Sequence, residues 1–581
     1  SLHWFDKSVV YRFKGEKMRQ LSNDNAANRA SFVGSVYNVG EKTVKDKLLD
    51  SFPSEWSRFH RQGYIHIHDL DAYGKTYNCL TFDVLPRFPY RDFIGLSETA
   101  KVIRLFGYFK TMFADMGNEQ SGGMAFANFD NEFDEILRRL EVTDNSAMRE
   151  LISSCIGDFI VWCNNTHTRM GQTSYYITLN IGLACNDRAR FIAYTVIDEF
   201  EKAGDTVYKP NIVFKVSDGV NRKEGDRNFD LFQKALLCTA KKMIPTYLLC
   251  DCEEDKAISA EKLSVMGCRT RVVDDLFGCQ GATGRGNIAN ISINLPRLAL
   301  ETEKNCKGME LADKIISFRY RWLEIAETAT EILVDRYNKT LGRAADEFPA
   351  NTSRQMWCVP FGEPSDVFKH GTLSIGFIGL SEAVEVLTGS RFYNSAESYQ
   401  VALDFVEFMR GYCDEQREKL HLNFSLLATS GELISGRFID IDKNLFEPGC
   451  DIFTKGFYTN SFHVNVDSGI SAREKLHKEG PFHILCNGGS ISYIELNEAP
   501  IGNDEGLMEL VEESIKVGVR YLGINFPKDI CNNCSASGVF DICPVCGSKD
   551  ITRIRRVSGY LEVLDGFTRG KKFEVKARST N

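Results

Sequence analysis

Near the C-terminal end of this 581-residue chain, four cysteines form two Cys-X-X-Cys pairs. Cys531 and Cys534 make the first pair, Cys543 and Cys546 the second, and residues 535–542 separate them. Four thiolates at this spacing can surround one ion tetrahedrally, which is the geometry of a structural Zn²⁺ site. Two redox disulfides or an iron–sulfur cluster could use the same residues, but the spacing favours zinc. Because four protein ligands leave no open position, we expect an architectural role.

The composition narrows the class of protein. The chain has 18 cysteines spread along its length, and its N-terminal residues lack an apolar signal segment. This favours reduced thiols in a cytoplasmic protein over a disulfide framework. No apolar run is long enough to span a bilayer, so no membrane contact is expected. The net charge of −9 argues against a long nucleic acid as partner, while small phosphorylated ligands need only a few local donors.

Changes in polarity, apolar spacing and cysteine content divide the chain into four parts. Residues 1–75 are polar and helical in pattern, and residues 76–527 alternate helix-like and strand-like segments. Residues 528–550 hold the four-cysteine ribbon, and residues 551–581 form a glycine-bearing tail. Helix–strand alternation over the long second part predicts an α/β fold, either a barrel or a doubly wound sheet.

Within the second part, apolar spacing marks individual elements. Residues 309–341 and 391–420 have apolar side chains at helical spacing and few helix breakers, so they predict long helices. Short apolar runs at 291–293, 424–427 and 482–485 predict buried strands.

The tail contains the sequence Arg-Val-Ser-Gly-Tyr-Leu, in which the glycine is Gly559. A glycine between serine and tyrosine is ordinarily a turn. This segment, however, resembles the signature of glycyl-radical enzymes, which store a radical on the glycine α-carbon. Glycine suits that task because it has no side chain and can enter a crowded site. The resemblance assigns Gly559 as the radical-storage residue.

Further motifs favour one glycyl-radical family. Met-Gly-Cys-Arg at 266–269, Asn-Leu-Pro-Arg at 294–297, and His-Ile-His-Asp followed by Asn-Cys at 66–79 resemble segments of anaerobic (class III) ribonucleotide reductases. So do Tyr-Thr-Asn-Ser-Phe-His-Val at 458–464 and Gly-Gly-Ser-Ile-Ser-Tyr-Ile-Glu-Leu at 488–496. By this resemblance Cys268 carries the thiyl radical, Cys79 is the second active-site thiol, and Asn287 matches an active-site asparagine of formate-using members. The histidines of the first segment are expected to make hydrogen bonds and not to bind a metal.

Two donor-rich turns are candidates for binding substrate phosphates. Thr429 and Ser430 lie between a predicted strand and a predicted helix, and Gly488, Gly489 and Ser490 follow another predicted strand. Free N–H groups at a helix start favour a diphosphate or triphosphate, although ordinary helix caps have the same appearance. Members of the family carry similar turns where the nucleotide binds, so the resemblance supports both turns as phosphate-binding candidates.

The resemblance implies a ten-stranded α/β barrel with a central finger loop that carries Cys268, next to a C-terminal loop that carries Gly559. It further implies reduction of ribonucleotides to deoxyribonucleotides, nucleotide effectors, a homodimer, and a radical-SAM iron–sulfur activating protein that installs the glycyl radical. Formate is the expected reductant. Cys358 and Cys486 could instead supply an extra pocket thiol for a thioredoxin-like reductant, but free cysteines are more often core residues.

Two other functions compete with this interpretation. An enzyme of the pyruvate formate-lyase type would need a pair of adjacent cysteines on the finger loop, and Cys268 has no cysteine neighbour. A zinc-ribbon protein that binds nucleic acid would be expected to carry excess positive charge, which this chain lacks.

Overall fold

The computed structural model describes residues 32–82, 84–86, 88–166, 175–252, 258–354, 356–359, 362–446 and 451–581. The first 31 residues of the expected helical region 1–75 lie outside this range. From residue 32 to Arg61 the region is mainly helical, and it then contains a short strand, β1 (Ile65–Ile67), and a 3-10 turn at Leu70–Ala72.

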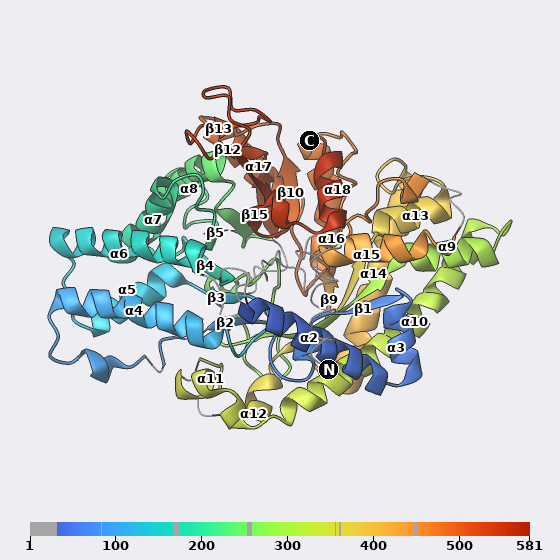
Figure 1. Ribbon diagram of the computed structural model, residues 1–581, viewed down its shortest axis with the longest axis horizontal. Coiled ribbons are helices and arrows are strands. Elements are labelled where there is room, and N and C mark those ends of the chain that lie inside the picture. The colour runs from blue at the N-terminus through green and yellow to red at the C-terminus, as the bar shows by residue number, and fades with distance from the viewer. Residues whose placement is uncertain are drawn as a thin grey trace.

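The strands lie at the centre of the molecule (Figure 1), and ten of them form a closed barrel. One half consists of parallel neighbours: β2 (Cys79–Phe82), β3 (Met124–Phe126), β4 (Ile177–Ile181), β5 (Asn211–Val216) and β6 (Thr246–Leu249). The other half is β7 (Gly286–Asn294), β8 (Thr372–Ile378), β9 (Phe424–Ala428), β10 (Ser492–Glu495) and β11 (Tyr521–Asn525). The halves meet through antiparallel pairs, β2 with β7 and β6 with β11, and β1 adds to β7 outside this path.

The barrel closes between β9 and β10. Leu427 and Gly489 form an isolated parallel bridge there. The N–H of Gly488 donates to the carbonyl of Leu426 at 2.8 Å, and the N–H of Ala428 donates to the carbonyl of Gly489 at 3.0 Å. The expected ten-stranded barrel is therefore confirmed, with two parallel five-stranded halves that run in opposite directions.

Helices surround this barrel, with α4–α7 along one side and α9, α10, α13 and α14 along the opposite side (Figure 1). Their bounds are α2 (Phe32–Ser51), α3 (Ser54–Arg61), α4 (Glu98–Met116), α5 (Phe129–Arg139), α6 (Ser146–Asn165), α7 (Asp187–Lys202), α8 (Phe229–Lys242), α9 (Leu295–Asn305), α10 (Leu311–Leu341), α11 (Pro349–Arg354), α12 (Pro364–Phe368), α13 (Leu380–Thr388), α14 (Ala396–Leu420), α15 (Leu433–Asp442), α16 (Ala472–Leu485), α17 (Asp504–Lys516) and α18 (Arg569–Ala577). A continuous apolar core fills the space between these helices and the strands.

Most elements expected from apolar spacing are present. The run 309–341 is the single helix α10, and 391–420 contains α14. The motif at 294–297 starts α9, because the side chain of Asn294 accepts from the N–H of Arg297 and caps the helix.

The expected strand at 482–485 is wrong, since these residues are the last turn of α16. Leu476, Glu479, Phe482 and His483 are buried at helical spacing in that helix. A four-residue apolar run cannot by itself distinguish a strand from a buried helical turn. Residues 488–490 consequently follow a helix and precede β10.

The C-terminal module is an antiparallel sheet of β13 (Ser537–Gly538), β12 (Lys528–Cys531), β14 (Ile551–Arg556) and β15 (Leu561–Val563), in that spatial order. Strand β12 comes from the ribbon and pairs with β14 of the tail. Ribbon and tail therefore share one sheet, whose β14–β15 turn holds Gly559.

Among the residues described, no helix combines the length and the apolar character needed to cross a membrane.

Candidate active site and metal centre

A finger loop between β6 and β7 brings Cys268 into the barrel. The loop reverses direction where the N–H groups of Met266 and Thr270 each donate to the other's carbonyl, at 3.2 and 3.1 Å. Gly267 has a φ of +59°, a left-handed conformation that glycine adopts at little cost, and this places Cys268 at the tip.

The tip is fixed by Arg269, which is 2% exposed. Its guanidinium donates to the carbonyl of Ala428 and to the hydroxyl of Tyr493, both at 3.1 Å. The N–H of Arg271 donates to the carbonyl of Gly488 at 3.0 Å. The loop is thus bound to the strands that close the barrel, which fixes the position of the neighbouring cysteine.

The turn that holds Gly559 lies against Cys268 at the fingertip. A Cβ on Gly559 would lie 2.5 Å from the carbonyl carbon and 2.8 Å from the Cα of Cys268, and closer still to its carbonyl oxygen. The turn is closed by a hydrogen bond from the N–H of Val557 to the carbonyl of Tyr560 at 3.0 Å, and the N–H of Gly559 donates to Oγ of Ser558 at 2.6 Å. Only glycine fits this approach without a shift of backbone.

A cavity of about 90 Å³ adjoins the fingertip. Its walls include Cys79, Cys268, Asn290, Thr429, Ser430 and Glu432. Strands β2, β7 and β9, the finger loop and the segment before α15 therefore all contribute to one space. The two cysteines that the sequence predicted as active-site thiols lie in the same wall.

Cys79 is the first residue of β2 and contacts the finger loop directly. Its Sγ accepts from the N–H of Gly123 at 3.2 Å, and a Cβ on Gly267 would lie 2.9 Å from that sulfur. Burial raises the pKa of the Cys79 thiol to about 12, although the Gly123 N–H opposes this. The thiol consequently stays protonated at neutral pH and can donate a hydrogen atom.

Cys268 is also held as a thiol. Its Sγ lies 3.7 Å from Oε1 of Glu432 and 3.7 Å from the hydroxyl of Tyr176. Burial, and then the nearby carboxylate of Glu432, raise the pKa of Cys268 to about 12. The other oxygen of Glu432 accepts from the hydroxyl of Tyr560 at 3.0 Å, next in sequence to Gly559. Glu432 thus contacts both the fingertip and the glycine turn.

Asn287 lies beside Cys79 but is not part of the cavity wall. The two residues are paired across the antiparallel β2–β7 ladder. The Asn287 side-chain amide donates to the hydroxyls of Thr372 and Ser374, both at 3.0 Å, and its Oδ1 is buried without a hydrogen-bond partner among the described residues. Asn290, three residues along the same strand, lines the cavity instead.

The two candidate phosphate turns differ in position. Thr429 and Ser430 line the cavity, and the Thr429 hydroxyl lies 2.8 Å from that of Ser292. The turn containing Gly488, Gly489 and Ser490 is not among the lining residues.

The hydrogen-bond donors of that second turn already bind other groups of the protein. The N–H of Gly488 takes part in barrel closure, that of Gly489 donates to Cys486, and Oγ of Ser490 lies 2.9 Å from Nδ1 of His483. The two turns are therefore not equivalent: the first faces the cavity, and the second holds the barrel closed.

The histidines near β1 make structural contacts. Nε2 of His68 lies 2.8 Å from Oγ of Ser292, and the rings of His66 and His68 pack edge to face at 4.7 Å. His68 therefore makes the kind of hydrogen bond expected of these histidines, whereas Nδ1 of His66 is buried without a hydrogen-bond partner among the described residues.

Some residues of the site were not identified from the sequence. Glu432 and Arg269 both lie within motifs that were recognised in the sequence. A carboxylate at a helix start, however, is ordinarily a helix cap, and an arginine in a loop is ordinarily a surface charge. Tyr176 and Asn290 carried no local signal, because only the closed barrel brings them to the fingertip.

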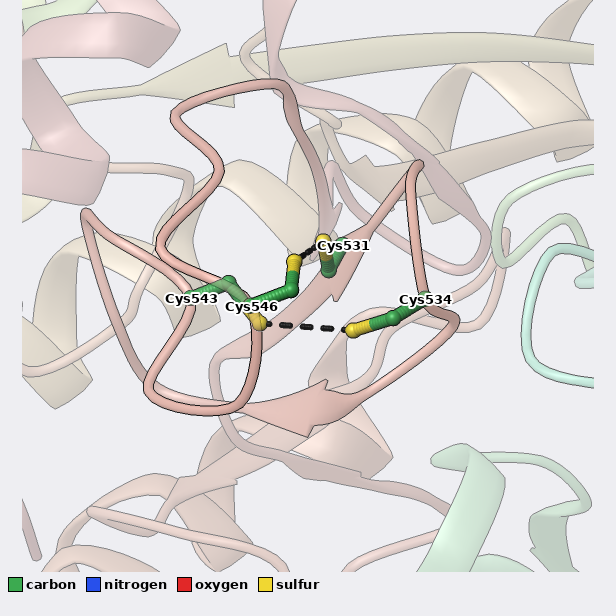
Figure 2. Close-up of side chains that lie close together, drawn as sticks. All are labelled: Cys531, Cys534, Cys543 and Cys546. Carbon is green, nitrogen blue, oxygen red and sulfur yellow. Dashed lines mark hydrogen bonds between the residues drawn. The ribbon is translucent and has the colours of Figure 1, made fainter.

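The four ribbon cysteines converge as expected (Figure 2). The Sγ atoms of Cys531, Cys534, Cys543 and Cys546 all lie within 4.8 Å of one another, and the pairs 531–546 and 534–543 are 3.5 Å apart. Four sulfurs around one Zn²⁺ at about 2.3 Å would be separated by roughly 3.8 Å, so little movement is needed. The residues present therefore fit a tetrahedral zinc ion.

The two cysteines considered as extra pocket thiols lie elsewhere. Cys486 is buried in the apolar core, and Cys358 neighbours Cys279 and His370. Neither lines the cavity at the fingertip.

Comparison with known proteins agrees with this geometry. Residues 24–580 match the family described as anaerobic ribonucleoside-triphosphate reductase. The enzyme of that name from Escherichia coli strain K12 is 29% identical over 93% of this chain and 80% of its own length, and that of enterobacteria phage T4 is 28% identical over 96% and 97%. A Thermotoga maritima anaerobic ribonucleotide reductase in complex with dATP and CTP superposes with a TM-score of 0.71 at 14% identity, covering 99% of this chain and 98% of that one. At this identity the structural likeness shows the fold.

Proposed function

The chain belongs to the family of anaerobic ribonucleoside-triphosphate reductases and reduces ribonucleotides to deoxyribonucleotides, and we propose that it does so with a radical stored on Gly559 and used on Cys268. The observation that carries this proposal is the contact between the Gly559 turn and the backbone of Cys268, beside a cavity that also holds Cys79. Storage site, working thiol and second thiol lie within one small region.

The protonation of the two thiols supports the order of events. Gly559, once it has lost a hydrogen atom, takes one from the thiol of Cys268, which becomes a thiyl radical. A thiolate could not give up a hydrogen atom, so the raised pKa of Cys268 keeps it competent. The Cys268 thiyl then takes the 3′ hydrogen of the bound ribose.

Cys79 acts at the 2′ carbon, after Cys268 has acted at the 3′ carbon. After the 2′ hydroxyl has taken up a proton and left as water, the Cys79 thiol supplies a hydrogen atom to the 2′ carbon. Its raised pKa again keeps it protonated. The 3′ hydrogen returns from Cys268, which regenerates the thiyl and then the radical on Gly559.

Formate is the proposed reductant. It returns a hydrogen atom to the Cys79 sulfur and passes one electron to the oxidised substrate as it becomes CO₂, so that ribonucleotide, formate and a proton give deoxyribonucleotide, CO₂ and water. We propose that Asn287 holds the formate beside Cys79, its partner across the β2–β7 ladder. Turning its amide would let Oδ1 accept from the hydroxyls of Thr372 and Ser374 and would leave the amide N–H groups to donate to formate, at the cost of the 3.3 Å hydrogen bond that the amide now donates to the Thr372 carbonyl.

The substrate phosphates are assigned to the start of α15. Thr429 and Ser430 face the cavity just before this helix, and their hydroxyls together with the helix start favour an anion, although the N–H groups of Gly431 and Glu432 already donate to Asn460 and Ser430. The Thermotoga maritima enzyme was crystallised with dATP and CTP. By analogy we propose that nucleotides act on this chain both as substrates and as effectors, that it forms a homodimer, and that a radical-SAM protein installs the radical.

The ribbon is proposed to hold a structural Zn²⁺ through its four cysteines. Because β12 pairs with β14, the ion would brace the sheet that presents Gly559 to the fingertip. With four thiolates bound it has no open position, and no step of the reaction passes through it.

The proposal is tested by separating radical storage from radical use. Cys268→Ala, activated without oxygen, should show the same glycyl-radical EPR doublet as the wild type and form no deoxynucleotide. Cys185→Ala, a change at an exposed cysteine away from the cavity, is the control and should keep both the EPR doublet and deoxynucleotide formation. Turnover by Cys268→Ala near the wild-type rate would contradict the assignment.

A further inference from the structure

Three side chains outside the active site and the ribbon converge on one point. Cys279, Cys358 and His370 each offer a ligand atom, and these atoms all lie within 4.8 Å of one another. Sγ of Cys279 is 3.9 Å from Nε2 of His370. The residues come from the loop that follows the fingertip, the segment 356–359, and the turn before β8. None of them lines the cavity that holds Cys268.

His370 is oriented by a carboxylate. Its Nδ1 lies 2.7 Å from Oδ2 of Asp275, so the Nδ1 hydrogen is engaged and the lone pair of Nε2 faces the sulfurs. A carboxylate on the far nitrogen is the usual partner of a metal-bound histidine, since it fixes both the tautomer and the ring. The ring itself is buried, with 3% of His370 exposed.

Asp275 is in turn held firmly. It accepts from the N–H groups of Phe277 at 3.1 Å and Cys279 at 2.7 Å, and from the side-chain amide of Asn423 at 2.8 Å. The same carboxylate therefore positions the backbone of one proposed ligand and the ring of another.

Backbone contacts also hold the remaining segments. The N–H of Cys358 donates to the carbonyl of Gly284 at 2.9 Å. Arg285, fully buried, donates to the carbonyls of His370 at 3.0 Å and Gly281 at 2.8 Å. The three candidate ligands are thus presented by a frame whose hydrogen bonds do not require the ion.

We propose that Cys279, Cys358 and His370 bind a second Zn²⁺, distinct from that of the ribbon, with Asp275 as the residue that positions His370. Two thiolates and one imidazole form a common donor set for zinc, at about 2.3 Å for sulfur and about 2.0 Å for nitrogen. Those lengths place sulfur and nitrogen roughly 3.6 Å apart and two sulfurs roughly 3.8 Å apart, so side-chain shifts of about 1 Å complete the site. Water takes the fourth position.

The location gives this ion a structural consequence. Residues 271–285 return from the fingertip to β7, which holds Asn287 next to Cys79. An ion that joins Cys279 on this return to Cys358 and His370 would tie the base of the finger loop to the start of β8. Loss of the ion should therefore lower thermal stability and loosen the loop while leaving the ribbon zinc in place.

Metal analysis of the full chain, purified without oxygen, tests the proposal. The wild type should hold about two Zn²⁺ per chain, and His370→Asn and Cys358→Ser about one each. Cys543→Ser should hold about one, and Cys543→Ser combined with His370→Asn close to none. His421→Asn is the matched control, because His421 packs against the same Phe277 ring at 5.4 Å but offers no ligand.

A second measurement keeps the test decisive if the variants fold poorly. X-ray absorption of wild-type zinc should show nitrogen as well as sulfur neighbours, because a four-thiolate ribbon alone gives sulfur only. One zinc per chain with sulfur neighbours only would overturn the proposal. So would a Cys279–Cys358 disulfide found by mass spectrometry after anaerobic alkylation.

Discussion

The Gly559 turn packs so closely on Cys268 that a single added carbon at Gly559 would overlap the Cys268 backbone. The whole second half of the barrel, from β7 to β11, lies between the two residues in sequence. Their contact depends on the closure of the strands between them and on the sheet that presents the turn. The contact between the proposed storage residue and the proposed working thiol is therefore a property of the complete fold.

Gly559→Ala is expected to abolish the glycyl radical. The added Cβ would lie 2.5 Å from the carbonyl carbon of Cys268, so the turn must withdraw, and alanine also constrains the backbone around the radical carbon. Anaerobic activation followed by EPR should give a doublet for the wild type and none for the variant. Exposure of the activated wild type to air should yield a C-terminal fragment that begins near Gly559 and ends at Asn581.

Gly411→Ala is the control for this experiment. A Cβ at Gly411, on helix α14, meets no atom within 4 Å. This variant should keep both the doublet and the oxygen-dependent cleavage. A doublet of wild-type intensity from Gly559→Ala would place the radical elsewhere.

Most of the site residues that could be predicted from the sequence were predicted from short motifs. The fingertip and tail motifs predicted Cys268 and Gly559 as site residues, and the structure brings the two into contact; the spacing of the ribbon cysteines predicted their convergence. The residues that sequence reasoning missed have no local mark. Cys279 and Cys358 are far apart in the chain, and only the return of the finger loop beside β8 brings them together. Glu432 stands at the start of a helix, where a carboxylate ordinarily indicates a cap.

Glu432→Gln is expected to lower the pKa of Cys268 while leaving that of Cys79 unchanged. Burial, and then the Glu432 carboxylate, raise the pKa of Cys268 to about 12. The pKa of Cys79 is also raised to about 12, but there burial is the main cause and Glu432 is not among the causes. Glutamine has nearly the same shape and removes the charge. Less repulsion of the thiolate means that more thiolate forms at a given pH above 9.

Alkylation measures this effect, because the thiolate is the reactive form. Between pH 9 and 11, iodoacetamide should modify Cys268 faster in Glu432→Gln than in the wild type, and Cys79 in the same samples serves as the internal control. The radical doublet should persist, and turnover should fall roughly tenfold because the thiol is less well positioned. Equal alkylation rates of Cys268 in both proteins would remove Glu432 from the electrostatics of the fingertip.

Cys543→Ser is expected to lose one zinc ion relative to the wild type and to reduce the radical yield several-fold. The ribbon shares a sheet with the hairpin that carries Gly559, so loss of the ion should loosen the presentation of the glycine turn. Ile530, Ile554 and Leu561 of this sheet join the apolar core, but the ten barrel strands lie outside the sheet, so the circular dichroism of the variant should be close to that of the wild type. Val545→Ser, a change at a 74% exposed residue between two ligands, should keep both metal and radical. Full radical yield in Cys543→Ser would contradict the bracing role.

The arrangement of the thiols leads to the last prediction, which is that formate and not a dithiol protein reduces the substrate. A thioredoxin-like reductant needs a second thiol that can form a disulfide with Cys79. The cysteines among the residues that line the described cavity are Cys79 and Cys268, and Cys268 is the proposed site of the thiyl radical. Cys486 is buried in the core, and Cys358 lies with Cys279 and His370.

Activated enzyme supplied with nucleotide and ¹⁴C-formate should therefore release labelled CO₂ in proportion to the deoxynucleotide formed, whereas a thioredoxin system alone should support no turnover. Asn287→Ala should raise the formate concentration needed for half-maximal rate, because an amide that can donate to the carboxylate is lost. Asn290→Ala, on the same strand and in the cavity wall, separates a formate effect from a general effect on the pocket. Thioredoxin-dependent turnover without CO₂ would contradict the formate assignment, and it would leave the radical chemistry of Gly559 and Cys268 intact.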